Sequence, residues 1–111
     1  ALFNLARVYQ NRELWGKSNS ILMNFLKIKG PSSSVYSAMA WNNLMSGKLE
    51  EASKLYEKVL KYESNNQEAL INLAKIYYSL GKKSTSESYI KRALKLDLLQ
   101  SQSNELEKLL K

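Results

Sequence analysis

The chain has 111 residues, a length typical of one domain, and it contains neither cysteine nor histidine. The missing residue types exclude disulfides, thiolate or imidazole metal sites, and Ser-His-Asp or Cys-His catalysis. There is also no Gly-rich phosphate loop, so we expect a protein that is not an enzyme and that holds no cofactor and no metal ion. The formal net charge of +7 favours acidic partners, nucleic acid or anionic surfaces, unless the lysines are simply solvated on outer helix faces.

No apolar run approaches the roughly 18 residues of a membrane span, and the first residues lack the layout of a signal peptide. The lack of cysteine fits a reducing compartment, so we expect an intracellular, cytoplasmic protein. The sequence begins at Ala1 within a helical pattern, and we therefore expect a fragment of a longer chain.

The first half of the chain predicts two helices and the start of a third. In Ala1–Asn11, apolar residues recur with the spacing of one helical face. A second stripe runs from Ser18 to Ile28 and ends at Gly30-Pro31, because proline cannot continue a helix. Ser32, Ser33 and Ser34 offer N-caps for a helix that runs to about Ser46.

The second half continues in the same way. Gly47 is a turn, and the next helix, with an apolar stripe from Leu49 to Tyr62, has two glutamates in its first turn. Asn65 and Asn66 are expected to cap the following helix, with Glu68 completing a capping box.

Gly81 is the third turn, and Ser84–Glu87 predicts a capping box that opens a helix to about Leu98. Ser101–Lys111 reads as a short amphipathic helix that covers the end of the array.

A repeat organises these elements. Ala69–Tyr78 reads A-L-I-N-L-A-K-I-Y-Y, and Ala1–Gln10, twice 34 residues earlier, reads A-L-F-N-L-A-R-V-Y-Q. A weaker copy lies midway, at Ser37–Leu44. A fixed period of this length indicates stacked helical hairpins.

The pattern resembles the tetratricopeptide repeat, a helix–turn–helix unit of 34 residues. The matching positions are Leu2, Leu5, Ala6, Tyr9, Leu22 and Phe25 in the first unit, Tyr36, Met39, Ala40, Gly47, Ala52, Tyr56 and Val59 in the second, and Leu70, Leu73, Ala74, Tyr77, Gly81, Ile90 and Ala93 in the third. The resemblance implies an all-α, right-handed superhelical solenoid of antiparallel helix pairs. We expect a single domain, 1–111, with units at about 1–32, 33–66 and 67–100 and a capping helix at 101–111.

Some positions depart from the family pattern. Glu13 replaces the turn glycine, and Asn43 stands where the other units have Tyr9 and Tyr77. We therefore expect a looser turn and a shifted packing angle in the first hairpin. Ser18 and Ser86 replace small alanines.

The resemblance implies that the first helices of the pairs line a concave groove that binds an extended peptide or a helix of a partner protein. The groove-facing set is Phe3, Asn4, Arg7, Gln10 and Asn11 in the first unit, Ser37, Ala38, Trp41, Leu44 and Met45 in the second, and Ile71, Asn72, Lys75, Tyr78 and Ser79 in the third. Of these, we expect contacts from Asn4, Arg7, Asn11, Trp41, Leu44, Met45, Asn72, Lys75 and Tyr78.

Trp41 is the most distinctive residue of this set, because its period mates are Arg7 and Lys75. An indole flanked by two cations suits an acidic or aromatic peptide, although Trp41 could instead fill a gap between helices. The family's carboxylate clamp for chaperone tails is not expected, because Phe3 and Glu68 fall where cations are needed. Trp15, in the first turn, is a weaker candidate for a contact.

Two alternatives remain open. The basic charge permits binding of nucleic acid or another anionic surface, although the 17 cations are spread over all the helices, so nucleic acid is not the favoured partner. The chain could also be a purely structural stretch of a longer solenoid, or form a homo-oligomer through its uncapped N-terminal end.

Overall fold

The computed structural model describes residues 2–111, and side chains from Asn4 onward. Within that part the chain forms seven α-helices and no strand. Their bounds are Leu2–Asn11 (α1), Trp15–Lys29 (α2), Ser33–Met45 (α3), Leu49–Tyr62 (α4), Gln67–Ser79 (α5), Lys83–Leu94 (α6) and Gln100–Leu110 (α7).

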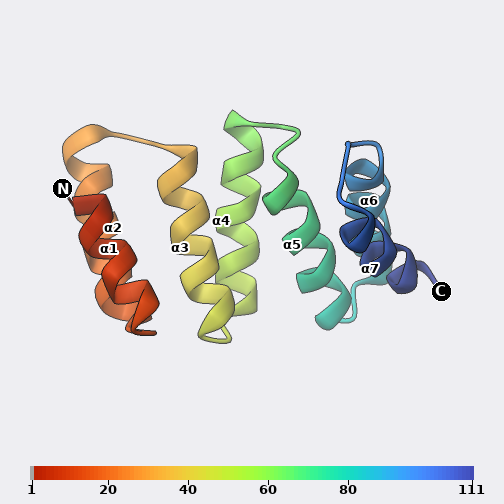
Figure 1. The fold of residues 1–111 in the computed structure, drawn as a ribbon, viewed down its shortest axis with the longest axis horizontal. Helices are drawn as coiled ribbons and strands as arrows, with labels where there is room; N and C mark the ends of the chain where they lie inside the picture. Colours follow the sequence, from red (N-terminus) through yellow and green to blue (C-terminus); the bar gives the residue numbers. More distant parts are fainter. Residues whose placement is uncertain (1) are drawn as a thin grey trace.

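The helices follow one another along the molecule, with the N-terminus at one end and the C-terminus at the other (Figure 1). The main contacts lie within the pairs α1–α2, α3–α4 and α5–α6 and between each pair and the next, and α7 packs against α6 and α5. The molecule is elongated, at 42 × 24 × 23 Å, and its main contacts join helices that are neighbours along the row, so it is an open stack and not a closed bundle. The expected all-α solenoid of antiparallel helix pairs is confirmed.

Small residues at one position of each first helix let neighbouring helices approach closely. Ala6, Ala40 and Ala74 are 2%, 0% and 0% exposed. Larger side chains fill the space around them, among them Tyr56 and Leu73 in the central cluster. Burying one leucine-sized side chain contributes roughly 1.5–3 kcal/mol, so these contacts between pairs stabilise the stack.

The three turns within the pairs have the same backbone geometry. Glu13, Gly47 and Gly81 all have positive φ, of 58°, 86° and 79°. The closing hydrogen bonds are also alike: Leu14 N to Tyr9 O at 2.9 Å, Lys48 N to Asn43 O at 2.8 Å and Lys82 N to Tyr77 O at 2.9 Å. The expectation of a looser first turn is therefore wrong, because the backbone bonds hold Glu13 in a left-handed conformation that glycine adopts at no steric cost.

The helix caps were predicted only in part. The prediction of Ser32 is confirmed, since its side chain accepts a hydrogen bond from the amide of Val35 at 3.4 Å. The cap of α5 is Asn66, which accepts from Ala69 N at 2.9 Å, and not a capping box of Asn65 and Glu68.

The predicted capping box of Ser84–Glu87 is wrong. Helix α6 already begins at Lys83, and its N-cap residue Lys82 contributes no side-chain bond. Ser86 instead lies buried inside the helix, and its hydroxyl donates to the carbonyl of Ala74 at 2.7 Å. Helix α6 also ends at Leu94, before the predicted Leu98.

A buried polar network joins the first two pairs. Asn42 is 0% exposed, although its period mates are Val8 and Ile76. Its amide donates to Ser18 Oγ at 2.9 Å and to Asn19 Oδ1 at 2.8 Å, and its oxygen accepts from Gln10 Nε2 at 2.8 Å. Because these bonds satisfy a buried amide, they fix α1 and α2 against α3.

Candidate functional site

Three adjoining cavities lie along one side of the stack and are lined by residues of α1, α3, α5 and α7. We call these three cavities together the groove. The Trp41 cavity, of about 310 Å³, is lined by Arg7, Gln10, Ser34, Ser37, Ala38, Trp41 and Glu68. The second cavity, of about 370 Å³, is lined by Gln67, Glu68, Ile71, Asn72, Lys75, Gln102 and Glu105. The third, of about 430 Å³, is lined by Lys75, Tyr78, Ser79, Glu105, Lys108 and Leu109.

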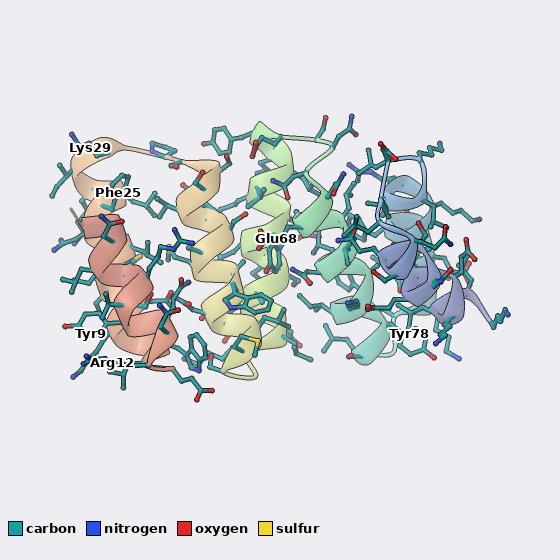
Figure 2. All side chains as sticks on the ribbon, viewed as in Figure 1. Tyr9, Arg12, Phe25, Lys29, Glu68 and Tyr78 are labelled. Atoms are coloured by element: carbon teal, nitrogen blue, oxygen red, sulfur yellow. The ribbon has the colours of Figure 1, made fainter. Side chains whose placement is uncertain are left out.

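Shared residues connect these cavities. Glu68 belongs to the first and the second, and Lys75 and Glu105 belong to the second and the third. Figure 2 labels Glu68 in the middle of the row of helices and Tyr78 toward α7. The groove therefore runs along the row from α1 to α7.

Trp41 is the large apolar residue of the first cavity. It lies on α3 and remains 40% exposed, so its indole does not merely fill a gap in the core. Tyr78, which is 41% exposed, provides a second aromatic surface in the third cavity. Exposed aromatic side chains in concave surfaces are typical of contact sites.

The Glu68 carboxylate is held in place by the core of the second pair. The hydroxyl of Tyr56 donates to Glu68 Oε2 at 3.3 Å and accepts a hydrogen bond from Asn72 Nδ2 at 3.0 Å. The Glu68 side chain as a whole is exposed, but its carboxyl group is partly buried. This burial raises the pKa of the Glu68 carboxyl, and the hydrogen bond from Tyr56 offsets part of the rise by lowering that pKa.

Lys75 is not a free cation. Its Nζ lies 2.7 Å from Oε2 of Glu105 on α7, and the hydrogen bond from Lys75 lowers the pKa of Glu105. Three cations, Arg7, Lys75 and Lys108, line the groove together with the two carboxylates. The groove is thus close to electrically balanced, and most of the net charge of +7 lies elsewhere.

Five of the nine predicted contact residues line the cavities: Arg7, Trp41, Asn72, Lys75 and Tyr78. The other four do not line any of these cavities. Asn4 and Asn11 are exposed on α1, Met45 is 48% exposed at the end of α3, and Leu44 is half-buried against the central core cluster. The side chain of Phe3 lies outside the described residues. Trp15 is half-buried at the start of α2, away from these cavities.

Sequence reasoning placed Glu68 beside the groove only as an argument against the carboxylate clamp, and it missed Glu105 and Gln102. Glu68 was interpreted as a capping residue, because it follows Asn65 at the spacing of a capping box. Glu105 and Gln102 lie on α7, which was expected only to cover the end of the stack. A signal for Glu68 did exist, since its helical position is one turn before Asn72 on the groove face.

In the part of the chain that the structure describes, no group of three or more acidic side chains is placed to hold a metal ion. Within the same residues, no helix combines the length and the apolar character that crossing a membrane requires.

An open stack of helix pairs with cavities along one face defines a helical-repeat protein. The sequence matches the tetratricopeptide repeat family over residues 43–107, more than half of its length, and the chain belongs to this family. No curated protein sequence matches it at a significant level.

Solved structures share the fold. The Yersinia enterocolitica type III secretion chaperone SycD, in complex with a peptide of the translocator YopD, has a TM-score of 0.88 at 13% identity and covers 98% of this chain and 86% of its own. The first TPR of Spaghetti (RPAP3), bound to the HSP90 peptide SRMEEVD, has a TM-score of 0.86 at 14% identity, with 97% and 86% covered. MamA has a TM-score of 0.79 at 17% identity over 86% of this chain, which spans 56% of the MamA chain.

Proposed function

We propose that this chain is a non-enzymatic protein-interaction module that holds an extended segment of a partner protein in the groove. The observation that carries the proposal is Trp41, an indole that is 40% exposed inside a cavity walled by three successive repeat units. A peptide that covers this ring removes apolar surface from water and reaches Gln10 and Ser37 with its backbone.

The shape of the groove supports an extended peptide. The cavities adjoin along the row from α1 to α7, and the polar side chains between the aromatic residues, such as Asn72 and Gln102, can pair with peptide backbone groups. Two structures of similar fold, SycD and the first TPR of Spaghetti, carry a bound peptide. That likeness concerns the fold, and the contacts proposed for this chain rest on its own residues.

The HSP90 peptide SRMEEVD, bound by the Spaghetti domain, has two acidic side chains and an acidic C-terminal residue. A partner of that kind is not proposed for this chain. Glu68 presents a carboxylate to both the first and the second cavity, and it would repel an acidic tail.

The proposal is tested by selecting random dodecapeptides displayed on phage against the immobilised protein. The enriched peptides are then labelled with fluorescein, and their affinities are measured by fluorescence anisotropy for the wild type, Trp41→Ala and Trp15→Ala. We expect Trp41→Ala to weaken binding by about tenfold or more, as for a buried aromatic contact, and Trp15→Ala to change it by less than about twofold.

Circular dichroism of each variant controls for loss of structure. Wild-type affinity of Trp41→Ala for all enriched peptides would contradict the assignment of the groove. Failure to enrich any peptide over an unrelated immobilised protein would contradict the proposed function as a whole.

A further inference from the structure

The Trp41 cavity brings together three groups that bear on the charge of a ligand. These are the Trp41 ring, the Glu68 carboxylate and the Arg7 guanidinium. On the basis of the proposed function, that the groove holds an extended peptide, we infer that this cavity selects partners by a basic side chain, arginine or lysine, which lies over the Trp41 ring and pairs with Glu68.

The position of the carboxylate is fixed from within the core. Tyr56 is 0% exposed, and its hydroxyl donates to Glu68 Oε2 while it accepts from Asn72 Nδ2. The hydrogen bond from Tyr56 occupies one carboxylate oxygen, and the other can accept from a guanidinium or an ammonium group. Such a preorganised acceptor loses little conformational entropy on binding.

Glu68 forms no salt bridge with a cation in the described part of the chain. The donor from Tyr56 is neutral, and the ion pair that forms along this face joins Lys75 to Glu105 instead. Partial burial raises the pKa of the Glu68 carboxyl, as is typical of an anion that lacks a compensating cation. A ligand cation would supply that missing charge.

The Trp41 ring adds to the same preference. The face of an indole carries negative potential, so a guanidinium or an ammonium group is attracted to it and a carboxylate is not. A long basic side chain also lays its methylene groups against the exposed ring. The Trp41 ring and the Glu68 carboxylate therefore both favour a cation.

Arg7 is the opposing group, and its influence is weaker. Its side chain is exposed on α1, where water and salt screen its charge, and it can turn away from a ligand. It remains in the same cavity as Glu68, so it should reduce the affinity for a basic side chain to some extent. Neutral substitutions of Glu68 and of Arg7 should therefore change the affinity for a basic side chain in opposite directions, and a test can measure each effect.

The test uses three pools of fluorescein-labelled nonapeptides with the central residue fixed as arginine, alanine or glutamate and the others random. Retention of each pool is measured on immobilised wild type, Glu68→Gln, Arg7→Gln and Trp41→Ala. We expect the wild type to retain the arginine pool about tenfold better than the glutamate pool. Glu68→Gln should lower retention of the arginine pool toward that of the alanine pool and leave only the smaller preference due to the Trp41 ring. Arg7→Gln should raise retention of the arginine pool, and Trp41→Ala should lower retention of all pools.

Glutamine keeps the size of glutamate and can still accept from Tyr56, so Glu68→Gln removes the charge with little change of structure. The inference is overturned if the glutamate pool is retained best or if Glu68→Gln leaves the arginine preference unchanged. In either case a loss of retention on Trp41→Ala would still support the groove. If Trp41→Ala leaves retention of all pools unchanged, the proposed function fails together with the inference.

Discussion

The hydroxyl of Tyr56 donates a hydrogen bond to Oε2 of Glu68 across 3.3 Å and thereby connects the core of the second pair to the wall of the groove. Tyr56 occupies a position where the repeat requires a large side chain to fill the space between helices. Burial, together with the nearby Glu68 carboxylate, raises the pKa of this hydroxyl, so it stays protonated and acts as a donor. One residue thus packs the core and also positions a charged group of the groove.

Replacement of Tyr56 by phenylalanine tests this relationship. The ring remains, but Glu68 loses a donor and Asn72 loses an acceptor. We expect a loss of about 1 kcal/mol in the free energy of unfolding in urea, because water at the cavity wall can replace part of the lost bonds. Affinity for a peptide with a basic side chain should also fall severalfold, since Glu68 is no longer held in place. Unchanged affinity would show that Tyr56 has a packing role only.

The pH dependence of binding provides a second prediction. Burial raises the pKa of Glu68 above the ordinary value of 4.5, and a ligand cation favours its ionised form. Affinity for a basic peptide should therefore decrease as the pH falls from neutral through the raised pKa of Glu68, and binding in that range should take place with release of a proton. Isothermal titration calorimetry in buffers of different ionisation enthalpy measures both quantities.

The other ionisable groups around Glu68 should not produce this decrease in affinity at lower pH. Arg7 of α1 and Lys75 of α5 are cations, Tyr56 of α4 stays protonated, and the pKa of Glu105 of α7 is lowered by Lys75. In the Glu68→Gln control, affinity should be independent of pH over this range. An equal pH dependence in wild type and Glu68→Gln would contradict the assignment to Glu68.

The turn at Glu13 predicts a stabilising substitution. Glu13 has φ of 58°, a conformation that costs a residue with a Cβ about 1 kcal/mol relative to glycine. Glu13→Gly should therefore raise the free energy of unfolding by up to about 1 kcal/mol.

The equivalent glycines supply the reverse control. A Cβ at Gly47 or Gly81 would meet no atom within 4 Å, so Gly47→Ala and Gly81→Ala change only the backbone energy. Each should destabilise the protein by about 1 kcal/mol in the same urea titrations. A destabilising effect of Glu13→Gly would show that the side chain of Glu13 contributes more than its backbone strain costs.

The polar network at Asn42 predicts a strongly destabilising substitution. Asn42→Ala leaves Gln10, Ser18 and Asn19 without their shared partner at a buried interface. We expect a loss of about 2–4 kcal/mol in the free energy of unfolding. Ser86→Ala is the matched control, because it removes the single bond to the Ala74 carbonyl and should cost about 1 kcal/mol. Similar losses for the two variants would argue against a cooperative network.

The repeat period predicted the fold well, because burial in a helix follows directly from spacing. Ala6, Ala40 and Ala74 lie at equivalent positions and are all buried. The period also placed Trp41 at the position equivalent to Arg7 and Lys75, and all three residues line the cavities.

Contacts between distant residues could not be predicted in this way. Glu68 fits a local capping pattern, but its carboxylate pairs with Tyr56 on the preceding helix. Lys75 was expected to flank Trp41 in the groove, and the period did not predict that it pairs with Glu105 thirty residues later, on a helix that lies outside the repeat. Leu44 shows the same limitation, because its position on a helix face did not reveal that it packs against the central core cluster.

The central claim, that the groove binds a peptide, is tested most directly by chemical-shift mapping of the ¹⁵N-labelled protein with one selected peptide. The two indole Nε1–H signals, from Trp15 and Trp41, serve as internal reporters that alanine variants assign. We expect large shifts for the Trp41 indole and for the amides of Arg7, Ala38 and Glu68, with little change at Trp15 or at Lys54 and Lys58 on α4. Shifts confined to α2, α4 and α6, with the Trp41 indole unmoved, would contradict it.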